Sequence, residues 1–397
     1  MTSKNGSSTN GYSPNALASR TGGDVVCDAI LEAGVDVVFG MPGGASLPFY
    51  DALYRYQDRL RHVQIRHEQA AGFAANGYAR ATGKIGVATS TSGPGATNMV
   101  TCMANDMMDS VGVVYITGQV ARPAIGSDAF QETDITGISI PITKHSYLVL
   151  DVDDLPRVMK EAFHLAASGR PGPVHVDIPK DIFLESTTEV APRDLNLRGY
   201  QPPKVGNRKM VRRAADVINA SERPVIMAGH GIDISGASDE LFELASCGNI
   251  PVVSTLHGVG TFPETHPLSF GMLGMHGLAY ANFAMGQTDC IIGLGTRFDD
   301  RAVGKADEFG PDAKVVHIDV DPAEIGKVLQ TDVPIVGDLK MTLEHLLPLI
   351  EQRERVAWID QLNHWRDEHR SLDIPESPDS VLPQEVVRAI YEVSGGK

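Results

Sequence analysis

The sequence predicts an α/β protein made of two doubly wound parallel-sheet domains, followed by the start of a third domain. The chain has 397 residues, enough for two to three domains of ordinary size. From residue 23 onward, short runs rich in β-branched residues alternate with longer helical stretches, as in parallel sheets covered by helices. Hydrophobic residues make up 42% and charged residues 21% of the chain, which is ordinary for a folded protein.

The first domain is expected to alternate strands and helices over residues 23–186. Its first helix ends at Gly34, and the strand that follows is stopped by a glycine-rich run. Strands are expected at 35–39, 62–65, 85–89, 111–117 and 174–178. Helices are expected at 24–33, 46–56, 68–82, 98–108 and 155–167.

The second domain, expected over residues 209–372, repeats this organisation. Strands are expected at 224–228, 252–254, 290–294 and 314–319, and helices at 211–220, 238–247 and 341–353. A further helix is expected at 383–393.

The remaining segments are expected to be a leader, a linker and an incomplete domain. Residues 1–22 are rich in Ser, Asn and Gly without an apolar stretch, which indicates a disordered leader rather than a secretory signal. Residues 187–208 lose the alternation and contain several prolines, which predicts a linker. Residues 373–397 are expected to begin a third domain, because the helix at 383–393 has nothing after it to pack against.

Composition excludes several classes of function. The formal charge is −16, which argues against broad nucleic-acid binding, because phosphates need a basic face. The longest apolar runs are too short to cross a bilayer, so no membrane association is expected and the cytoplasm is the default location. The four widely spaced cysteines form no CxxC pair, and neither HExxH nor GxSxG occurs. No metal site is expected among these residues.

Glu68 is the first candidate catalytic residue, because it lies at the start of a predicted helix, directly after a predicted strand. Ligands collect at the carboxyl ends of strands in open α/β sheets. A carboxyl group with apolar neighbours can exchange a proton near neutral pH. The alternative is that Glu68 only favours the positive end of the helix dipole.

Three glycine-rich turns also follow predicted strands, at 40–44, 92–96 and 229–231. Glycines let backbone N–H groups approach a ligand closely, and helix N-termini favour anions. None of the turns matches GxGxxG or a Walker loop, and helix entry alone would also explain them.

Two later segments have a composition that suits a nucleotide-like ligand. Residues 295–301 place two arginines among two aspartates, which fits a phosphate or a ribose, or else a surface ion-pair cluster. Residues 271–277 combine three glycines with two methionines, which fits a loop flattened against a planar ring, or else a plain connection with Met as core filler.

Taken in order, the motifs resemble those of the thiamine-diphosphate enzymes, and within them the acetolactate synthase (acetohydroxyacid synthase) large subunits. The resemblance covers residues 21–397. It is carried by FGMPGG at 39–44, RHEQAA at 66–71, NGYAR at 76–80, TSGPGATN at 91–98, DAFQE at 128–132 and RPGP at 170–173, with segments 271–277 and 297–301.

The resemblance implies a pyrimidine-binding domain, a central FAD-binding domain and a diphosphate-binding domain. It implies that Glu68 faces the thiamine aminopyrimidine, that Gly43 lies near the reacting oxyanion, and that Gln119 and Lys144 line the active-site channel. The implied reaction is decarboxylation of pyruvate and condensation with a second 2-oxo acid, pyruvate or 2-oxobutyrate, in branched-chain amino-acid biosynthesis. Gly93 and Asn98 are also implied in thiamine diphosphate binding.

For FAD, the resemblance implies a larger set, in which the flavin is structural. The set is Arg170, Gly229, Gly231, Thr255, Leu256, Leu273, Met275, His276, Gly295, Arg297, Asp299, Arg301, Asp319 and Asp338. Three positions depart from the family pattern: Met41 replaces a usual Tyr, Ala121 a frequent Pro, and His230 a small residue.

The largest departure concerns Mg2+ and the diphosphate. The family holds them with Gly-Asp-Gly…Asn, and no Gly-Asp-Gly occurs in these 397 residues. The chain is therefore expected to be a fragment or half of a split enzyme, and to be inactive without the diphosphate domain. A homodimer or tetramer and a small regulatory subunit are implied as partners.

Two other functions stay open. One is a related thiamine-diphosphate carboligase or decarboxylase, which product analysis with pyruvate would reveal. The other is a non-catalytic FAD-binding remnant, which would show no turnover even with a diphosphate domain added.

Overall fold

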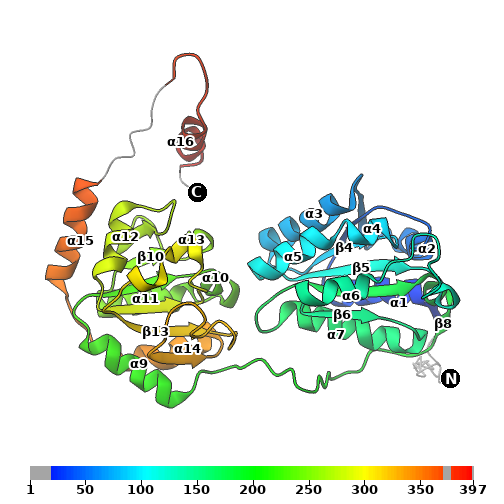
Figure 1. Ribbon diagram of the computed structural model, residues 1–397, viewed down its shortest axis with the longest axis horizontal. Coiled ribbons are helices and arrows are strands. Elements are labelled where there is room, and N and C mark those ends of the chain that lie inside the picture. Colours follow the sequence, from blue (N-terminus) through cyan, green and yellow to red (C-terminus); the bar gives the residue numbers. More distant parts are fainter. Residues whose placement is uncertain (1–18, 370–376, 396–397) are drawn as a thin grey trace, which may run out of the picture. The chain divides into compact units, whose positions relative to one another are not determined.

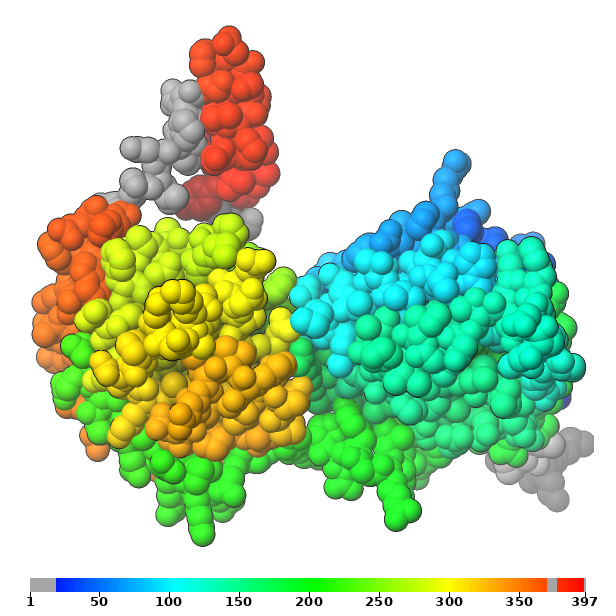
Figure 2. All heavy atoms as spheres, in the orientation of Figure 1, coloured from blue at the N-terminus to red at the C-terminus, as the bar shows by residue number. Residues whose placement is uncertain are grey.

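The computed structural model describes residues 19–369 and 377–395, and the chain divides into two compact units between Pro202 and Pro203 (Figure 1). This division falls inside the segment expected as a linker. Drawn as spheres, residues 19–187 and 208–368 each form a continuous surface on the face shown (Figure 2). Each contains one six-stranded parallel sheet. The expected fold class is therefore confirmed.

The first unit contains the elements up to residue 187. Its strands are β1 (Arg20–Thr21), β2 (Val37–Gly40), β3 (Arg61–Gln64), β4 (Gly86–Ser90), β5 (Val113–Gln119), β6 (His145–Leu148), β7 (Val174–Pro179) and β8 (Ser186–Thr187). Its α-helices are α1 (Gly22–Glu32), α2 (Leu47–Arg55), α3 (Glu68–Thr82), α4 (Pro94–Thr97), α5 (Val100–Asp109), α6 (Ile135–Ser139), α7 (Leu155–Ala167) and α8 (Lys180–Leu184). Short 3-10 turns are η1 (Arg122–Ala124), η2 (Ile140–Ile142) and η3 (Val152–Asp154).

The first sheet has the order β3-β2-β4-β5-β7-β6 and is covered on both faces. Alternate residues of β5 point to opposite faces, so Val114 and Ile116 pack with α1, α2 and α7, whereas Val113 and Tyr115 pack with α3 and α5. The chain runs outward from β2 to β3, then returns to β4 on the other side of β2. This reversal places the loops after β2 and β4 side by side, at the position where open α/β sheets bind ligands.

The second unit has the same design. Its strands are β9 (Pro224–Ala228), β10 (Val252–Ser254), β11 (Ser269–Met272), β12 (Cys290–Leu294), β13 (Lys314–Asp319) and β14 (Val333–Val336). Its helices are α9 (Arg208–Ala220), α10 (Gly231–Ser235), α11 (Ser238–Gly248), α12 (Ala279–Gln287), α13 (Asp300–Val303), α14 (Leu339–Leu346), α15 (Val356–Glu368) and α16 (Pro383–Ser394), with 3-10 turns η4 (Leu256–Gly258), η5 (Ala306–Glu308) and η6 (Leu347–Leu349).

The second sheet has the order β11-β10-β9-β12-β13-β14, so its chain reversal lies between β9 and β12. One face of the sheet packs against α9, α11 and α14, and the other against α12 and α15. Trp358 of α15 donates from Nε1 to the Pro224 carbonyl at 3.1 Å, which fixes α15 to the start of β9. The large apolar side chains of α16 are exposed within the described residues.

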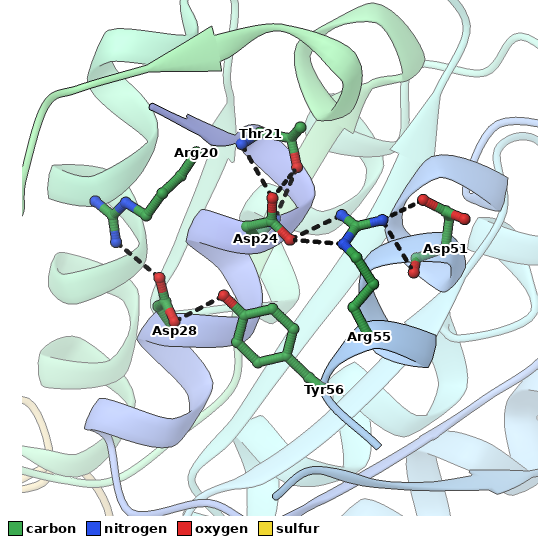
Figure 3. Close-up of polar contacts among 7 residues, drawn as sticks. All are labelled: Arg20, Thr21, Asp24, Asp28, Asp51, Arg55 and Tyr56. Carbon is green, nitrogen blue, oxygen red and sulfur yellow. Dashed lines mark hydrogen bonds and ion pairs between the residues drawn. The ribbon is translucent and has the colours of Figure 1, made fainter. Parts of the chain in front are cut away.

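The predicted end of the leader, at residue 22, was wrong, because residues 20–22 belong to strand β1 and the start of helix α1. Thr21 caps α1 by accepting from the Asp24 backbone, while the Asp24 carboxylate accepts from the Thr21 backbone at 3.1 Å. Arg55 of α2 donates to Asp24 at 2.8 Å, which ties α2 to this first turn (Figure 3). Residues 1–18 of the expected leader lie outside the described residues.

Several edge elements were missed by the sequence patterns. Strands β6, β11 and β14 each lie at an edge of their sheet, and β6 shows only partial burial, so it lacks the apolar run of a central strand. Helices α12 and α15 were also missed. The helix expected over 341–353 was too long, because α14 ends at Leu346, two residues before Pro348.

Candidate active site

Glu68 is the first residue of α3, and it is buried with 5% of its surface exposed. His67 caps the helix through Nδ1, which accepts from the Gln69 backbone at 3.2 Å. Asn98 donates from Nδ2 to Glu68 Oε2 at 3.0 Å. The carboxyl group is therefore held at the sheet's carboxyl edge by a neutral donor, without a cation as partner among the described residues.

The loops after β2 and β4 approach each other closely beside this carboxyl group. The Ala45 backbone donates to Thr91 Oγ1 at 3.1 Å. A Cβ added to Gly43 would lie 2.5 Å from Thr91 Cβ, and one added to Gly95 would lie 3.3 Å from Glu68 Oε1. The two loops can meet only because these positions lack a side chain.

Gly93 allows the sharp turn of the loop after β4 into helix α4. Its φ of 54° lies in the left-handed region, and a Cβ there would lie 2.5 Å from the Gln131 carbonyl oxygen. It precedes α4 as the N-cap, so the loop can enter the helix and present Asn98 to Glu68. The structure thus brings together Glu68, Gly43, Gly93 and Asn98.

Gln119 ends β5 at the same edge of the sheet, and it is buried. Its Nε2 donates to the Thr133 carbonyl and to Asp177 Oδ2, each at 2.9 Å. The backbone N–H of Val120 donates to Gln119 Oε1 at 2.9 Å. The amide group is therefore fixed by the protein itself.

Lys144 and Arg170 are placed elsewhere. Lys144 precedes β6, and its Nζ donates to the Ser168 carbonyl at 2.8 Å and to Tyr200 OH at 2.9 Å. Since all strands are parallel, the start of β6 lies at the opposite edge from Glu68. Arg170 precedes β7 and donates from Nε to Ser110 Oγ at 2.8 Å. Neither side chain is brought together with Glu68 in this chain.

Sequence analysis missed a buried polar chain behind Gln119. It consists of Thr117, His175 and Asp177 in the β5–β7 pair, with Ser139 and Ser146 beyond the imidazole. Burial raises the pKa of Asp177 to about 7 and lowers that of His175 to about 3. The signal in the sequence was the alternation of two polar residues, 175 and 177, with apolar ones in a central strand.

In the second unit, the predicted flavin residues follow the carboxyl ends of the strands. Gly229 and Gly231 follow β9, Gly295 follows β12, and Asp319 ends β13. A Cβ on Gly229 would lie 2.1 Å from the Gly295 carbonyl oxygen, and the Gly231 backbone donates to that oxygen at 3.0 Å. The loops after β9 and β12 therefore pack backbone against backbone, at the point where the strand order reverses.

The remaining members of this set line the same edge. Thr255 and Leu256 follow β10, Leu273, Met275 and His276 follow β11, Arg297, Asp299 and Arg301 follow β12, and Asp338 follows β14. A cavity of about 420 Å³ is lined by Met275, Arg301 and Lys305, among others. Asp299 and Asp338 cap helices α13 and α14 through their carboxylates.

Arg297 is half-buried at this edge and has no hydrogen bond or ion pair to any other described residue. A guanidinium in this state can still use its forked donors for an anion. Beside it, His317 of β13 is buried, and its Nε2 lies 2.8 Å from the Thr296 carbonyl oxygen. Burial lowers the His317 pKa to about 4, so the imidazole is neutral and adds no competing charge.

The described ranges 19–369 and 377–395 hold no cluster of three or more His, Cys, Asp or Glu side chains that fits a metal ion. Across the same ranges, no helix has both the length and the apolar character needed to span a bilayer.

Comparison with known proteins shows which proteins this chain is similar to. Residues 20–138 match the model "Thiamine pyrophosphate enzyme, N-terminal TPP binding domain", and residues 211–346 match "Thiamine pyrophosphate enzyme, central domain". The chain is 49% identical over 386 residues to the acetolactate synthase of Mycobacterium bovis, covering 96% of this chain and 62% of that protein.

Further relatives give the same result. The chain is 47% identical over 392 residues to the acetolactate synthase large subunit of Parasynechococcus marenigrum, covering 97% of this chain and 63% of the relative. The large subunit of Corynebacterium glutamicum is 46% identical over 382 residues, covering 94% and 60%. The chain thus spans about three fifths of the length of the curated relatives it matches.

Proposed function

Because the chain belongs to the thiamine pyrophosphate enzymes, with acetolactate synthases among its relatives, we propose that it takes part in the acetolactate synthase reaction. In this reaction pyruvate loses CO2, and its remaining two carbons join pyruvate or 2-oxobutyrate to give a 2-acetohydroxy acid. The observation that carries the proposal is the buried Glu68 carboxyl group, held by Asn98 between two glycine loops.

The residues of the first unit fit the pyrimidine end of thiamine diphosphate. A Cβ on Gly95 would lie 3.3 Å from Glu68 Oε1, so the glycine keeps this side of the carboxyl group free of a side chain. Glu68 would exchange a proton with the pyrimidine ring, and Asn98 would keep the Glu68 carboxyl group oriented. When bound, thiamine diphosphate supplies a carbon that takes up the electrons left when a 2-oxo acid loses CO2.

The residues of the second unit fit a dinucleotide such as FAD. The closed backbone turn at Gly229, Gly231 and Gly295 can approach a pyrophosphate, and Arg297 has its donors available. We infer a structural role for the flavin, because that is what the resemblance to acetolactate synthases implies.

The residues described do not fit Mg2+, because they provide no cluster of carboxylates for it and the sequence has no Gly-Asp-Gly. We therefore derive no step through the ion. A homodimer or tetramer, and a small regulatory subunit, remain proposals that rest on the relatives.

The test is Glu68→Gln in this chain completed by a diphosphate-binding domain, assayed with pyruvate, thiamine diphosphate, FAD and Mg2+. We expect turnover to fall about 10²–10⁴-fold, because the amide cannot exchange the proton. Glu32→Gln, at the exposed end of α1, is the matched control and should keep full turnover. Release of acetaldehyde instead of a 2-acetohydroxy acid by the wild type would contradict the proposed reaction.

A further inference from the structure

The side-chain amide of Gln119 has both of its donors and one of its acceptor lone pairs engaged by protein groups. Both hydrogens of its amide nitrogen have acceptors, the Thr133 carbonyl and Asp177 Oδ2. One lone pair of Oε1 is used by the Val120 backbone N–H. An amide has two donors and two acceptor lone pairs, so one Oε1 lone pair is left for a ligand.

The orientation of this amide follows from the buried chain behind it. Thr117 donates from Oγ1 to Asp177 Oδ1 at 2.6 Å, so the hydroxyl proton is committed to the carboxylate. Thr117 Oγ1 also lies 2.7 Å from His175 Nε2, and it must accept there, which places the imidazole proton on Nε2. His175 Nδ1 then accepts from Ser139 or Ser146, at 3.0 and 2.9 Å.

All donors therefore point one way along the chain, from the two serines through His175 and Thr117 to Asp177. The carboxylate at its end accepts on both oxygens, from Thr117 and from Gln119. A carboxylate cannot donate, so the nitrogen of the Gln119 amide has to face Asp177 and its oxygen has to face away. Thr117, Ser139, His175 and Asp177 are almost entirely buried, where an unpaired polar group is costly, and Ser146 is half-buried.

We propose that Asp177, held by Thr117 and His175, is a positioning residue that turns the Gln119 amide so that it offers a ligand only an acceptor. The group that contacts Gln119 is then a donor, a hydroxyl or amino group, rather than a carboxylate or keto oxygen. This inference rests on the proposed function for the identity of the ligand, but the orientation of the amide does not depend on it.

The experiment compares Thr117→Val with Thr117→Ser in the complete protein near pH 8, where the Asp177 carboxylate prevails because its pKa is about 7. Valine has the shape of threonine without its hydroxyl, so Asp177 loses one donor and His175 loses its acceptor. Serine restores both contacts. Tyr147→Phe is the control, since it removes a hydroxyl from the neighbouring strand β6 that bonds to Glu161 instead.

The first readout is NMR of protein labelled with 15N in its histidine rings and glutamine amides. We expect His175 to carry its proton on Nε2 in the wild type, Thr117→Ser and Tyr147→Phe. In Thr117→Val, we expect the signals of both the imidazole and the Gln119 amide to shift. A wild-type His175 protonated on Nδ1, or unchanged Gln119 signals in Thr117→Val, would overturn the proposal.

The second readout is kinetic. We expect Thr117→Val to lower kcat about 10–100-fold with a smaller change in KM, because a misplaced Gln119 amide weakens a contact made mainly in the transition state. Thr117→Ser keeps the hydroxyl and should keep the wild-type kcat. An equal kcat in both variants would overturn the positioning role. If the wild type forms no 2-acetohydroxy acid, the proposed function fails, whereas the NMR result still decides the amide orientation.

Discussion

Asn98 Nδ2 lies 3.0 Å from Glu68 Oε2, and this hydrogen bond joins the end of α4 to the start of α3 in the first unit. Asn98 is the C-cap of α4, whereas Glu68 opens α3. The bond satisfies one oxygen of a buried carboxyl group and fixes its direction. The candidate site therefore depends on the loop after β4 as much as on Glu68 itself.

Replacing Asn98 with Ala should lower turnover about tenfold or more, because Glu68 loses the donor that orients it. Turnover with pyruvate and the KM for thiamine diphosphate would measure the effect. The control is Thr97→Ala, one residue earlier, where an exposed hydroxyl bonds only locally to Pro94. Equal turnover in the two variants would show that Asn98 does not orient Glu68.

Two adjacent glycines should respond differently to Ala. In Gly43→Ala the new Cβ would lie 2.5 Å from Thr91 Cβ, so the loops after β2 and β4 must separate. In Gly44→Ala the new methyl group meets nothing within 4 Å. We expect weaker thiamine diphosphate binding, measured by calorimetry, only in Gly43→Ala. Similar affinities for both variants would contradict the close approach of the two loops.

In the second unit, Gly229→Ala should destabilise the fold and reduce the flavin content of the purified protein. The new Cβ would lie 2.1 Å from the Gly295 carbonyl oxygen, a backbone atom that cannot rotate away. Overpacking of this kind costs about 1–3 kcal/mol of unfolding free energy. Gly286→Ala, in open space on α12, provides the stability control and should leave the melting temperature unchanged or slightly higher.

Asp106 should make the stability of the first unit depend on pH. It is buried, and it accepts from Asn76 at 2.6 Å and from Tyr115 at 2.7 Å. Burial raises its pKa to about 6, above the ordinary 3.8. Between these values the folded state keeps a proton that the unfolded state releases, so stability falls as the pH rises from 4 to 6.

Asp106→Asn should remove this pH-dependent loss of unfolding free energy. The loss amounts to about 3 kcal/mol, at about 1.36 kcal/mol for each unit by which the pKa is raised. Denaturant unfolding of the variant and the wild type at pH 4, 5, 6 and 7 would measure it. Relative to the wild type, the variant should gain stability as the pH rises, whereas the exposed control Asp58→Asn should show no such trend. Parallel curves for Asp106→Asn and the wild type would rule out titration of Asp106 in this range.

Much of the fold and of the candidate site could be predicted from local sequence. The central strands β9, β10, β12 and β13 match the expected bounds, because a strand buried on both faces is a short apolar run wherever it occurs. The edge strands β6 and β11 could not be found in this way, since partial burial removes that signal. In β14, Val333 and Ile335 are buried, but Pro334 interrupts the strand pattern. Glu68 and the glycine turns were found because each has a local reason, a helix start or a strand end.

What the sequence by itself determined was the two α/β units, the family resemblance, and Glu68 with its glycine turns. What only the tertiary structure decided was which distant residues meet. Thr117 and Asp177 are direct partners in the β5–β7 register although 60 residues separate them, and no local pattern encodes that pairing. Strand order likewise sent Lys144 to the edge opposite Glu68. Such contacts depend on strand register, which is fixed only when the whole sheet closes over its core.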